Sequence, residues 1–217
     1  MLKFIKDILL PEECLFCGQT DYIVCPNCLN KIPFNFKTYK LPAPNLDKIL
    51  IAGDYNNRQL AQLIKNYKYR FQKNLGVPLG EFLINYLKQK LKKSAIQELI
   101  AKQKVIVVPL PLSNKRRRWR GFNQAEILAR AIADEFNWPM SLDLKRIKNR
   151  RPQAKLKEAD RLVNLQGAFT WRGDCLDNAT IILIDDIITT GATLNEAADV
   201  LKDVDAGTVI GLAVAKG

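Results

Sequence analysis

The chain has 217 residues, of which 47% are hydrophobic and 26% charged, with a formal net charge of +12 at pH 7. This length suits one α/β domain with a small appended module, and the composition is typical of a folded globular protein. Histidine is absent, which excludes a Ser-His-Asp triad, a histidine-ligated metal and an imidazole base. The surplus of positive charge favours polyanionic partners such as nucleic acid, diphosphates or an anionic membrane surface.

Residues 1–10 combine apolar side chains with Lys3, Lys6 and Asp7. The apolar run is short and interrupted by an acid, which argues against a signal peptide. We expect a short amphipathic helix packed on the body. Because no apolar run approaches about 18 residues, we expect no integral membrane span. The expected location is cytoplasmic, with a peripheral position at the inner membrane face as an alternative.

Four cysteines near the amino terminus form two Cys-x-x-Cys pairs separated by seven residues: Cys14, Cys17, Cys25 and Cys28. Four thiolates in two tight turns satisfy tetrahedral zinc without histidine, so we predict a structural zinc site. Paired disulfides are the main alternative, and they are disfavoured in a chain without a secretory signal. A fifth cysteine, Cys175, stands apart, and we expect it to be a buried or semi-buried structural residue.

Proline-rich residues 30–47 read as an extended linker that leaves the cysteine pairs. A strand is predicted over 48–55. Apolar residues then recur at helical spacing from Leu60 to Phe71, and a second helical stretch runs from about 77 to 93. We therefore predict two domains, a zinc-binding module with its linker over 1–47 and an α/β domain over 48–217.

Val105–Val108 is an apolar run typical of a strand buried on both faces, and Pro109 and Pro111 end it. A dense basic run and two amides follow: Lys115, Arg116, Arg117, Arg118, Trp119, Arg120, Asn123 and Gln124. Because the run follows a buried strand and precedes an amphipathic helix, it predicts a basic loop that closes over a diphosphate. A nucleic-acid patch without fixed geometry is the alternative. A further basic segment runs from Arg146 to Arg151.

A second apolar strand, Ile181–Ile184, precedes two carboxylates and a hydroxyl-rich turn. The turn opens an amphipathic helix, so its backbone N–H groups can cradle a phosphate. The carboxylates would repel that phosphate, and they suit ribose hydroxyls instead. The predicted ribose 5-phosphate site contains Asp185, Asp186, Thr189, Thr190, Gly191, Ala192 and Thr193. A plain strand, solvated turn and helix cap is the alternative. A Walker B strand is excluded because no Gly-x-x-x-x-Gly-Lys-Ser/Thr loop lies upstream.

The segment from Ile181 to Thr193 resembles the phosphoribosyl-diphosphate (PRPP) signature of type I phosphoribosyltransferases. Nearly the whole chain is similar to the ComF family, which includes ComFC- and GntX-like proteins. The resemblance also covers the four cysteines, Val108–Leu112, Arg120–Glu126, and Pro152-Gln153 with Arg161, Asn164 and Gly167–Phe169. It implies an α/β type I phosphoribosyltransferase fold, a parallel sheet flanked by helices, with a small amino-terminal zinc-knuckle module. Arg150-Arg151 departs from relatives that often carry threonine there.

The resemblance also implies PRPP and Mg²⁺ as ligands and a role in importing or using single-stranded DNA. Thr189 to Thr193 would hold the 5-phosphate, and Asp185 and Asp186 the ribose hydroxyls. No general base can be named, so catalysis stays open. The alternative is a non-catalytic factor that binds single-stranded DNA and whose PRPP pocket senses or gates. In a third interpretation, the zinc module docks a helicase or a DNA-uptake channel.

Overall fold

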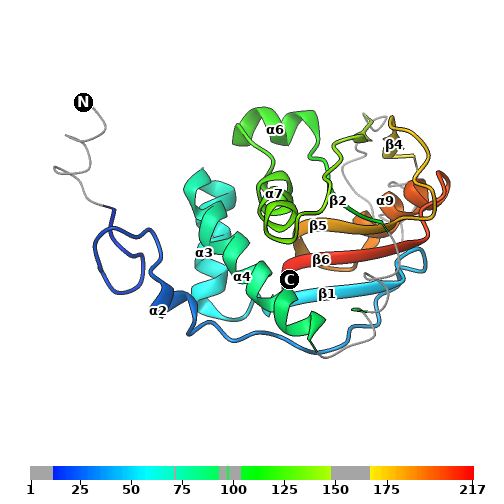
Figure 1. Cartoon of the computed structure of the whole chain (residues 1–217). Coiled ribbons are helices and arrows are strands. Elements are labelled where there is room, and N and C mark those ends of the chain that lie inside the picture. Colours follow the sequence, from blue (N-terminus) through cyan, green and yellow to red (C-terminus); the bar gives the residue numbers. More distant parts are fainter. Residues whose placement is uncertain (1–11, 71, 93–96, 98–103, 148–166) are drawn as a thin grey trace.

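A four-stranded parallel sheet forms the centre of the molecule (Figure 1). The computed structural model describes residues 12–70, 72–92, 97, 104–147 and 167–217. In the order of the sheet, the strands are β1 (Lys48–Asp54), β6 (Thr208–Lys216), β5 (Thr180–Ile188) and β2 (Val105–Pro109). The predicted strand at 48–55 and the two apolar strands are confirmed as β1, β2 and β5.

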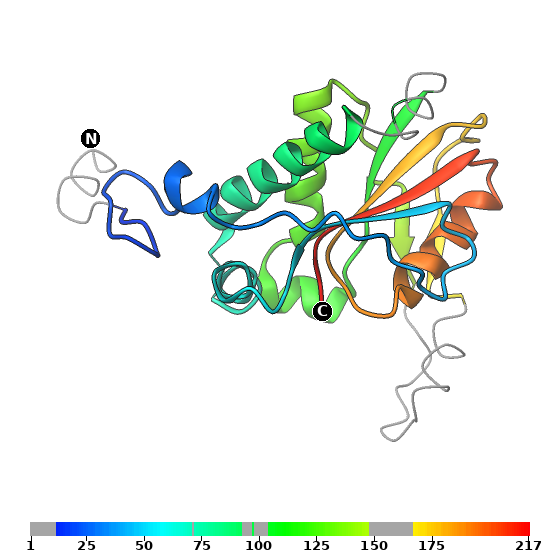
Figure 2. The ribbon, with the colours of Figure 1, turned by 90° about the horizontal axis from the view of Figure 1, so that it is seen from below.

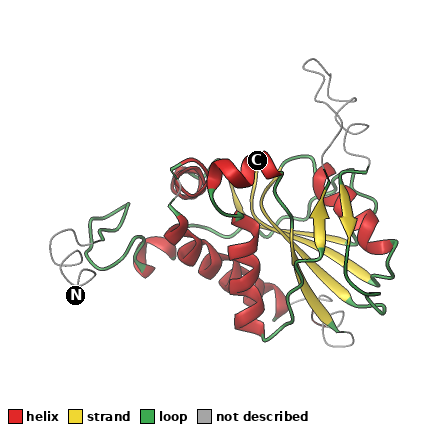
Figure 3. Ribbon diagram, turned by 90° about the horizontal axis from the view of Figure 1, so that it is seen from above, coloured by secondary structure: helices red, strands yellow, loops and turns green. Residues whose placement is uncertain are grey.

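Helices cover both faces of this sheet (Figure 2). On one face lie α3 (Arg58–Tyr69), α4 (Gly76–Leu91) and α7 (Gln124–Phe136), with the 3-10 turn η1 (Lys73–Leu75) before α4. On the other face lies α9 (Ala192–Lys202). A small antiparallel sheet of β3 (Leu144–Arg146) and β4 (Phe169–Trp171) lies on the α9 side, apart from the main sheet (Figure 3).

Each strand contributes to two separate apolar cores because successive side chains point to opposite faces. Ile182 and Ile184 of β5 join the core beneath α3, α4 and α7. Ile181 and Leu183 join the core beneath α9. The continuous apolar runs of the sequence are thus explained by a sheet buried on both sides.

The described part of the amino-terminal segment packs on the body at several places. The short helix α2 (Pro26–Leu29) contributes Cys28 and Leu29 to the same core as α3 and α4. The linker then crosses the molecule (Figure 2). The Asn45 N–H donates to Asn195 Oδ1 of α9 at 2.8 Å.

Two expectations are wrong in local structure. The basic run is a short helix, α6 (Asn114–Arg120), and not a loop. Ser113 caps it by accepting the Arg116 N–H, and Gly121 ends it in the left-handed conformation at φ +76°. Cys175 is exposed, because it lies in the turn before β5 and not in a core.

Several predicted features lie outside the described residues. They are the amphipathic segment 1–10, Phe71, most of the basic segment from Arg146 to Arg151, Pro152-Gln153, Arg161 and Asn164. Within the described part of the chain, no helix has the length and apolar character to cross a membrane.

Candidate functional site

The sequence predicts that the paired carboxylates follow the apolar strand. In the structure they lie inside β5 instead. The strand continues to Ile188 because β6 pairs with it along its whole length, including Ile187 with Ala215. Strand alternation places Asp185 in line with Leu183 and Asp186 in line with Ile184. The two acids therefore start on different faces of the sheet.

Asp186 forms a nearly buried ion pair. Its Oδ1 lies 2.7 Å from Lys68 Nζ on α3, and the two side chains are 9% and 14% exposed. The neighbouring Tyr67 is buried, and its hydroxyl donates to the Gln124 carbonyl oxygen at 3.0 Å. Burial, followed by the negative charge of Asp186, raises the pKa of Tyr67. The negative charge of Asp186 is thus balanced by the ammonium group of Lys68.

Asp185 has different surroundings. Its carboxylate accepts the Asp186 N–H at 2.7 Å. Burial and then the adjacent Asp186 raise the pKa of Asp185, with Lys68 acting in the opposite sense. Burial also lowers the pKa of Arg146 at the end of β3, as does the charge of Arg116, while Asp185 opposes that shift. Arg146 therefore interacts electrostatically with both Arg116 and Asp185.

The turn from Thr189 to Thr193 leads from β5 into α9. Gly191 adopts φ +83°, and its missing Cβ would lie 3.3 Å from Leu41 of the linker. The Ala192 N–H donates to Thr190 Oγ1 at 3.4 Å. The first N–H groups of a helix have no acceptor within it, so this turn directs donors and partial positive charge outward. It is a suitable cradle for an anion.

Helix α6 and its cations follow the carboxyl end of β2. Strand β2 is the neighbour of β5, which leads into this turn. Arg120 is buried, and its Nη1 donates to Gln124 Oε1 at 3.1 Å. The Asn123 amide donates to the Leu110 carbonyl oxygen at 3.1 Å. Among the described residues, Arg120 Nε, Asn123 Oδ1 and Gln124 Nε2 are buried without a hydrogen-bond partner. Such groups favour a polar ligand or ordered water at this position.

An aromatic pair adjoins the same helix. Trp119 of α6 and Tyr69 of α3 are 55% and 56% exposed, and their ring centroids lie 6.1 Å apart. The Arg120 guanidinium lies 5.7 Å from the Tyr69 ring and 6.0 Å from the Trp119 ring. Lys115, Arg116, Arg117 and Arg118 are all exposed. Together these side chains form a surface that is both basic and aromatic.

Sequence reasoning missed Lys68, Tyr69 and the position of Arg146 beside Asp185. Tyr67, Lys68 and Tyr69 end α3, more than a hundred residues before the acids. A lysine in a helical pattern reads as a solvated surface residue, so no local signal could have linked it to Asp186.

The four predicted ligand cysteines do gather. Their Sγ atoms lie within 4.8 Å of one another, a group that could hold a metal ion. Cys17 Sγ and Cys25 Sγ are 3.6 Å apart, close to the about 3.8 Å that tetrahedral zinc–sulfur bonds require. All four cysteines are free of disulfides.

The thiol environments also differ. Burial acts to raise the pKa of Cys14, but N–H groups of Cys25, Phe16 and Cys17 outweigh it and lower the pKa to about 6. The Cys25 N–H donates to Cys14 Sγ at 3.3 Å. Burial and the neighbouring thiols raise the pKa of Cys28 to about 12. A cation among the four sulfur atoms would stabilise the thiolate form that is disfavoured at Cys28.

Comparisons with known proteins agree with this architecture. Residues 121–216 match the phosphoribosyl transferase domain family. The chain is 31% identical over 203 residues to competence protein F of Haemophilus influenzae, covering 91% of this chain and 81% of that protein. It is 26% identical over 205 residues to the DNA utilization protein YhgH of Salmonella typhimurium, covering 93% and 82%.

Among solved structures, adenine phosphoribosyltransferase from Leishmania donovani is 14% identical, with a TM-score of 0.43 and coverage of 85% of this chain and 86% of that one. The parallel sheet, its flanking helices and the matched domain define a protein with a type I phosphoribosyltransferase fold. Its amino-terminal four-cysteine cluster is the second part of the architecture. The chain belongs to the ComF family, the family of competence protein F.

Proposed function

We propose that the carboxyl edge of β5 binds PRPP. The observation that carries the proposal is the Thr189–Thr193 turn, which begins α9 directly after β5 and its Asp185. The electrostatic interaction of Arg146 with both Arg116 and Asp185 supports it. The turn offers hydroxyls and helix N–H groups to a 5-phosphate, and Asp185 offers an acceptor to ribose hydroxyls. The two guanidinium groups oppose each other electrostatically, and a diphosphate between them would relieve that cost.

If turnover occurs, the reaction is displacement of diphosphate at the anomeric carbon of PRPP. Asp185 would hold the hydroxyls, directly or through water on Mg²⁺, while Asp186 stays paired with Lys68. The Mg²⁺ would offset negative charge on the diphosphate. Arg116, Arg118 and Arg120 would stabilise the charge that develops on the leaving diphosphate. No side chain of this chain is assigned as the general base.

Released diphosphate tests the enzymatic form of the proposal. The protein would be incubated with labelled PRPP, Mg²⁺ and a panel of nitrogenous acceptors. Steady diphosphate release supports a phosphoribosyltransferase. Saturable binding without release supports a factor that senses PRPP, and absence of binding rejects both.

We propose single-stranded DNA as a second ligand, bound by α6 and the Tyr69–Trp119 pair. Relatives named for competence and DNA utilization support the biological setting. Guanidinium groups can follow the phosphates while exposed rings stack on bases. Fluorescence anisotropy with a labelled oligonucleotide across a salt series tests this, and no binding at low salt rejects it.

We propose that the cysteine cluster holds structural zinc and that residues 1–47 form a module distinct from 48–217. Cys25→Ser or chelation should unfold the module and leave the sheet domain folded, because ligand bonds supply much of such a module's stability. Metal analysis and circular dichroism check this. Paired thiols without zinc would reject the metal assignment. Docking of a helicase or DNA-uptake channel on this module is a further proposal.

A further inference from the structure

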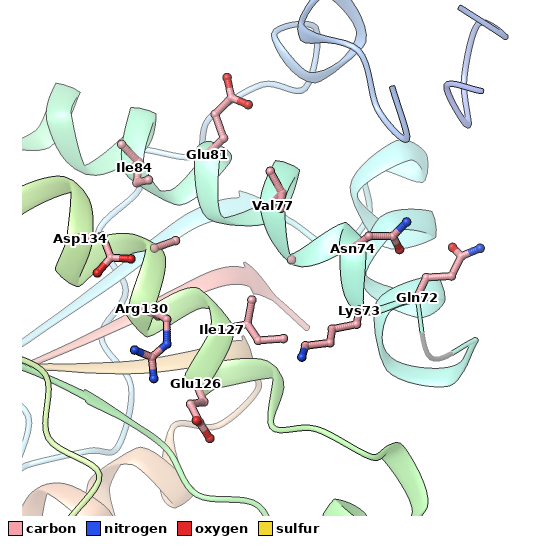
Figure 4. A pocket seen from close by; sticks show the side chains of 12 residues that line it. Gln72, Lys73, Asn74, Val77, Glu81, Ile84, Glu126, Ile127, Arg130 and Asp134 are labelled. Atoms are coloured by element: carbon pink, nitrogen blue, oxygen red, sulfur yellow. The ribbon is translucent and has the colours of Figure 1, made fainter. Parts of the chain in front are cut away.

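A cavity of about 1130 Å³ opens between α4 and α7, and none of the predicted site residues lines it. Figure 4 shows Val77 and Ile84 of α4 and Ile127 of α7 around it. Val77 is 73% exposed, and it lines the same cavity as Ile84 and Ile127, so these apolar side chains form one patch. The seam between these two helices is therefore an uncovered apolar groove.

The groove exists because two glycines bring the helices close together. A Cβ on Gly76 would lie 2.5 Å from Ile127 Cγ2, and one on Gly80 would lie 2.9 Å from Ala131 Cβ. Such contact leaves the two helices side by side, with a shallow seam above their line of contact. A third helix could pack in that seam.

Charge limits what that helix can be. The cavity lining contains three acids, Glu81, Glu126 and Asp134, against two bases, Lys73 and Arg130. The chain as a whole carries a net charge of +12, so this acidic lining is a local exception. An apolar seam between acids selects a basic amphipathic segment.

The sequence of residues 1–10 has this character. In residues 1–10, Met1, Phe4, Ile5, Ile8 and Leu9 follow the i, i+3, i+4, i+7, i+8 spacing of an apolar helix face. Lys3 and Lys6 fall outside that face. As a helix, ten residues extend about 15 Å.

The connection point is on the groove itself. Asn74 lines the cavity, and its Nδ2 donates to Glu12 Oε1 at 2.7 Å. Glu12, two residues after the segment in the chain, is therefore held at the edge of the groove, which would give residues 1–10 an effective concentration in the millimolar range there.

We propose that residues 1–10 bind the α4–α7 groove as a basic amphipathic helix. The apolar face covers Val77, Ile84 and Ile127, and the lysines meet the acidic rim. The segment then acts as a strap that fixes the cysteine module on the sheet domain.

Hydrogen–deuterium exchange tests this on the intact protein. The full chain is compared with a chain lacking residues 2–10 at several protein concentrations. We expect the deletion to speed exchange of 77–84 and 126–134 at least about tenfold, since the covering segment is gone. A synthetic peptide of residues 1–11 should restore protection to the shortened chain.

Val77→Asp in the full chain should speed exchange of residues 2–10 and of the groove, because a carboxylate replaces the exposed apolar contact. Leu142→Asp is the control, at an apolar residue 42% exposed and outside the groove, and should change neither. Equal exchange with and without residues 2–10 overturns the proposal. Protection that disappears on dilution also overturns it, since a second copy would then occupy the groove.

Discussion

Asp185 and Asp186 are neighbours in one strand, yet they meet different parts of the protein. Asp186 pairs with Lys68 in a nearly dry setting beneath α3. Asp185 has Arg146 and the α9 side of the sheet near it, and its pKa is raised by burial and by Asp186. Two adjacent carboxylates can thus divide the work, one stabilising the fold and the other left for a ligand.

The largest expected effect lies on the Asp185 side. Gly191→Val should lower PRPP affinity at least about 100-fold, because φ +83° is strained for valine and the turn would lose at least two donors to a charged phosphate. Calorimetry measures the change. Gly211→Ala is the control, since its added Cβ meets only contacts of 3.5 Å and beyond. Unchanged affinity in Gly191→Val would remove the turn from the site.

Substitution of Asp186 should lower the stability of the fold. Asp186→Asn leaves the Lys68 ammonium without its partner and should cost about 3 kcal/mol. For a chain of this size, that corresponds to a melting temperature lower by roughly 6–12 °C. The double variant Lys68→Met, Asp186→Leu should recover most of the loss. If Asp186→Asn were as stable as the wild type, Asp186 would not have the stabilising role assigned to it.

Tyr69 follows Lys68 on α3 and belongs to the proposed DNA-binding surface, so its substitution should change DNA affinity. Tyr69→Ala and Trp119→Ala should each lower single-stranded DNA affinity by about 1–3 kcal/mol with little change in salt dependence. Replacing Arg116, Arg117 and Arg118 by alanine should instead flatten the salt dependence, since fewer counterions are released. Anisotropy measures both. Identical salt slopes for the two kinds of variant would contradict the surface assignment.

The smallest effect concerns pH. The pKa of Asp185 is raised above its ordinary value of 3.8, so the folded protein holds a proton that the unfolded chain loses. Stability therefore falls as pH rises from about 4 towards the raised pKa. Asp185→Asn removes this cost, so its melting temperature should exceed that of the wild type by more at pH 8 than at pH 5. Equal differences at both pH values would contradict the shifted pKa.

Local sequence patterns were sufficient for three strands of the main sheet, β1, β2 and β5, whereas β6 was not predicted. Continuous apolar runs such as Ile181–Ile184 have few alternatives to a strand buried on both faces. The cysteine pairs likewise carry their geometry in their spacing, and the four Sγ atoms do gather.

Long-range relations escaped that reasoning. The Lys68–Asp186 pair joins residues more than a hundred positions apart, and only the packing of α3 on the sheet brings them together. The position of the basic run between a buried strand and an amphipathic helix predicts a loop, yet Ser113 and Gly121 cap it as a helix. A serine before the run and a glycine after it are the residues that typically cap a helix.

The most direct test of the central claim is a side-by-side titration of Mg²⁺-PRPP into wild type, Asp185→Asn and Asp186→Asn by calorimetry. It is run well below the melting temperature of each protein, with circular dichroism as the check on folding. We predict saturable binding by the wild type and a loss of about 10- to 150-fold for Asp185→Asn, because bound Mg²⁺-PRPP would favour the ionised carboxylate as a charged acceptor and asparagine cannot supply it. Asp186→Asn should lose less than about threefold, since its partner is Lys68. No binding by the wild type, or equal losses in the two variants, would contradict the account.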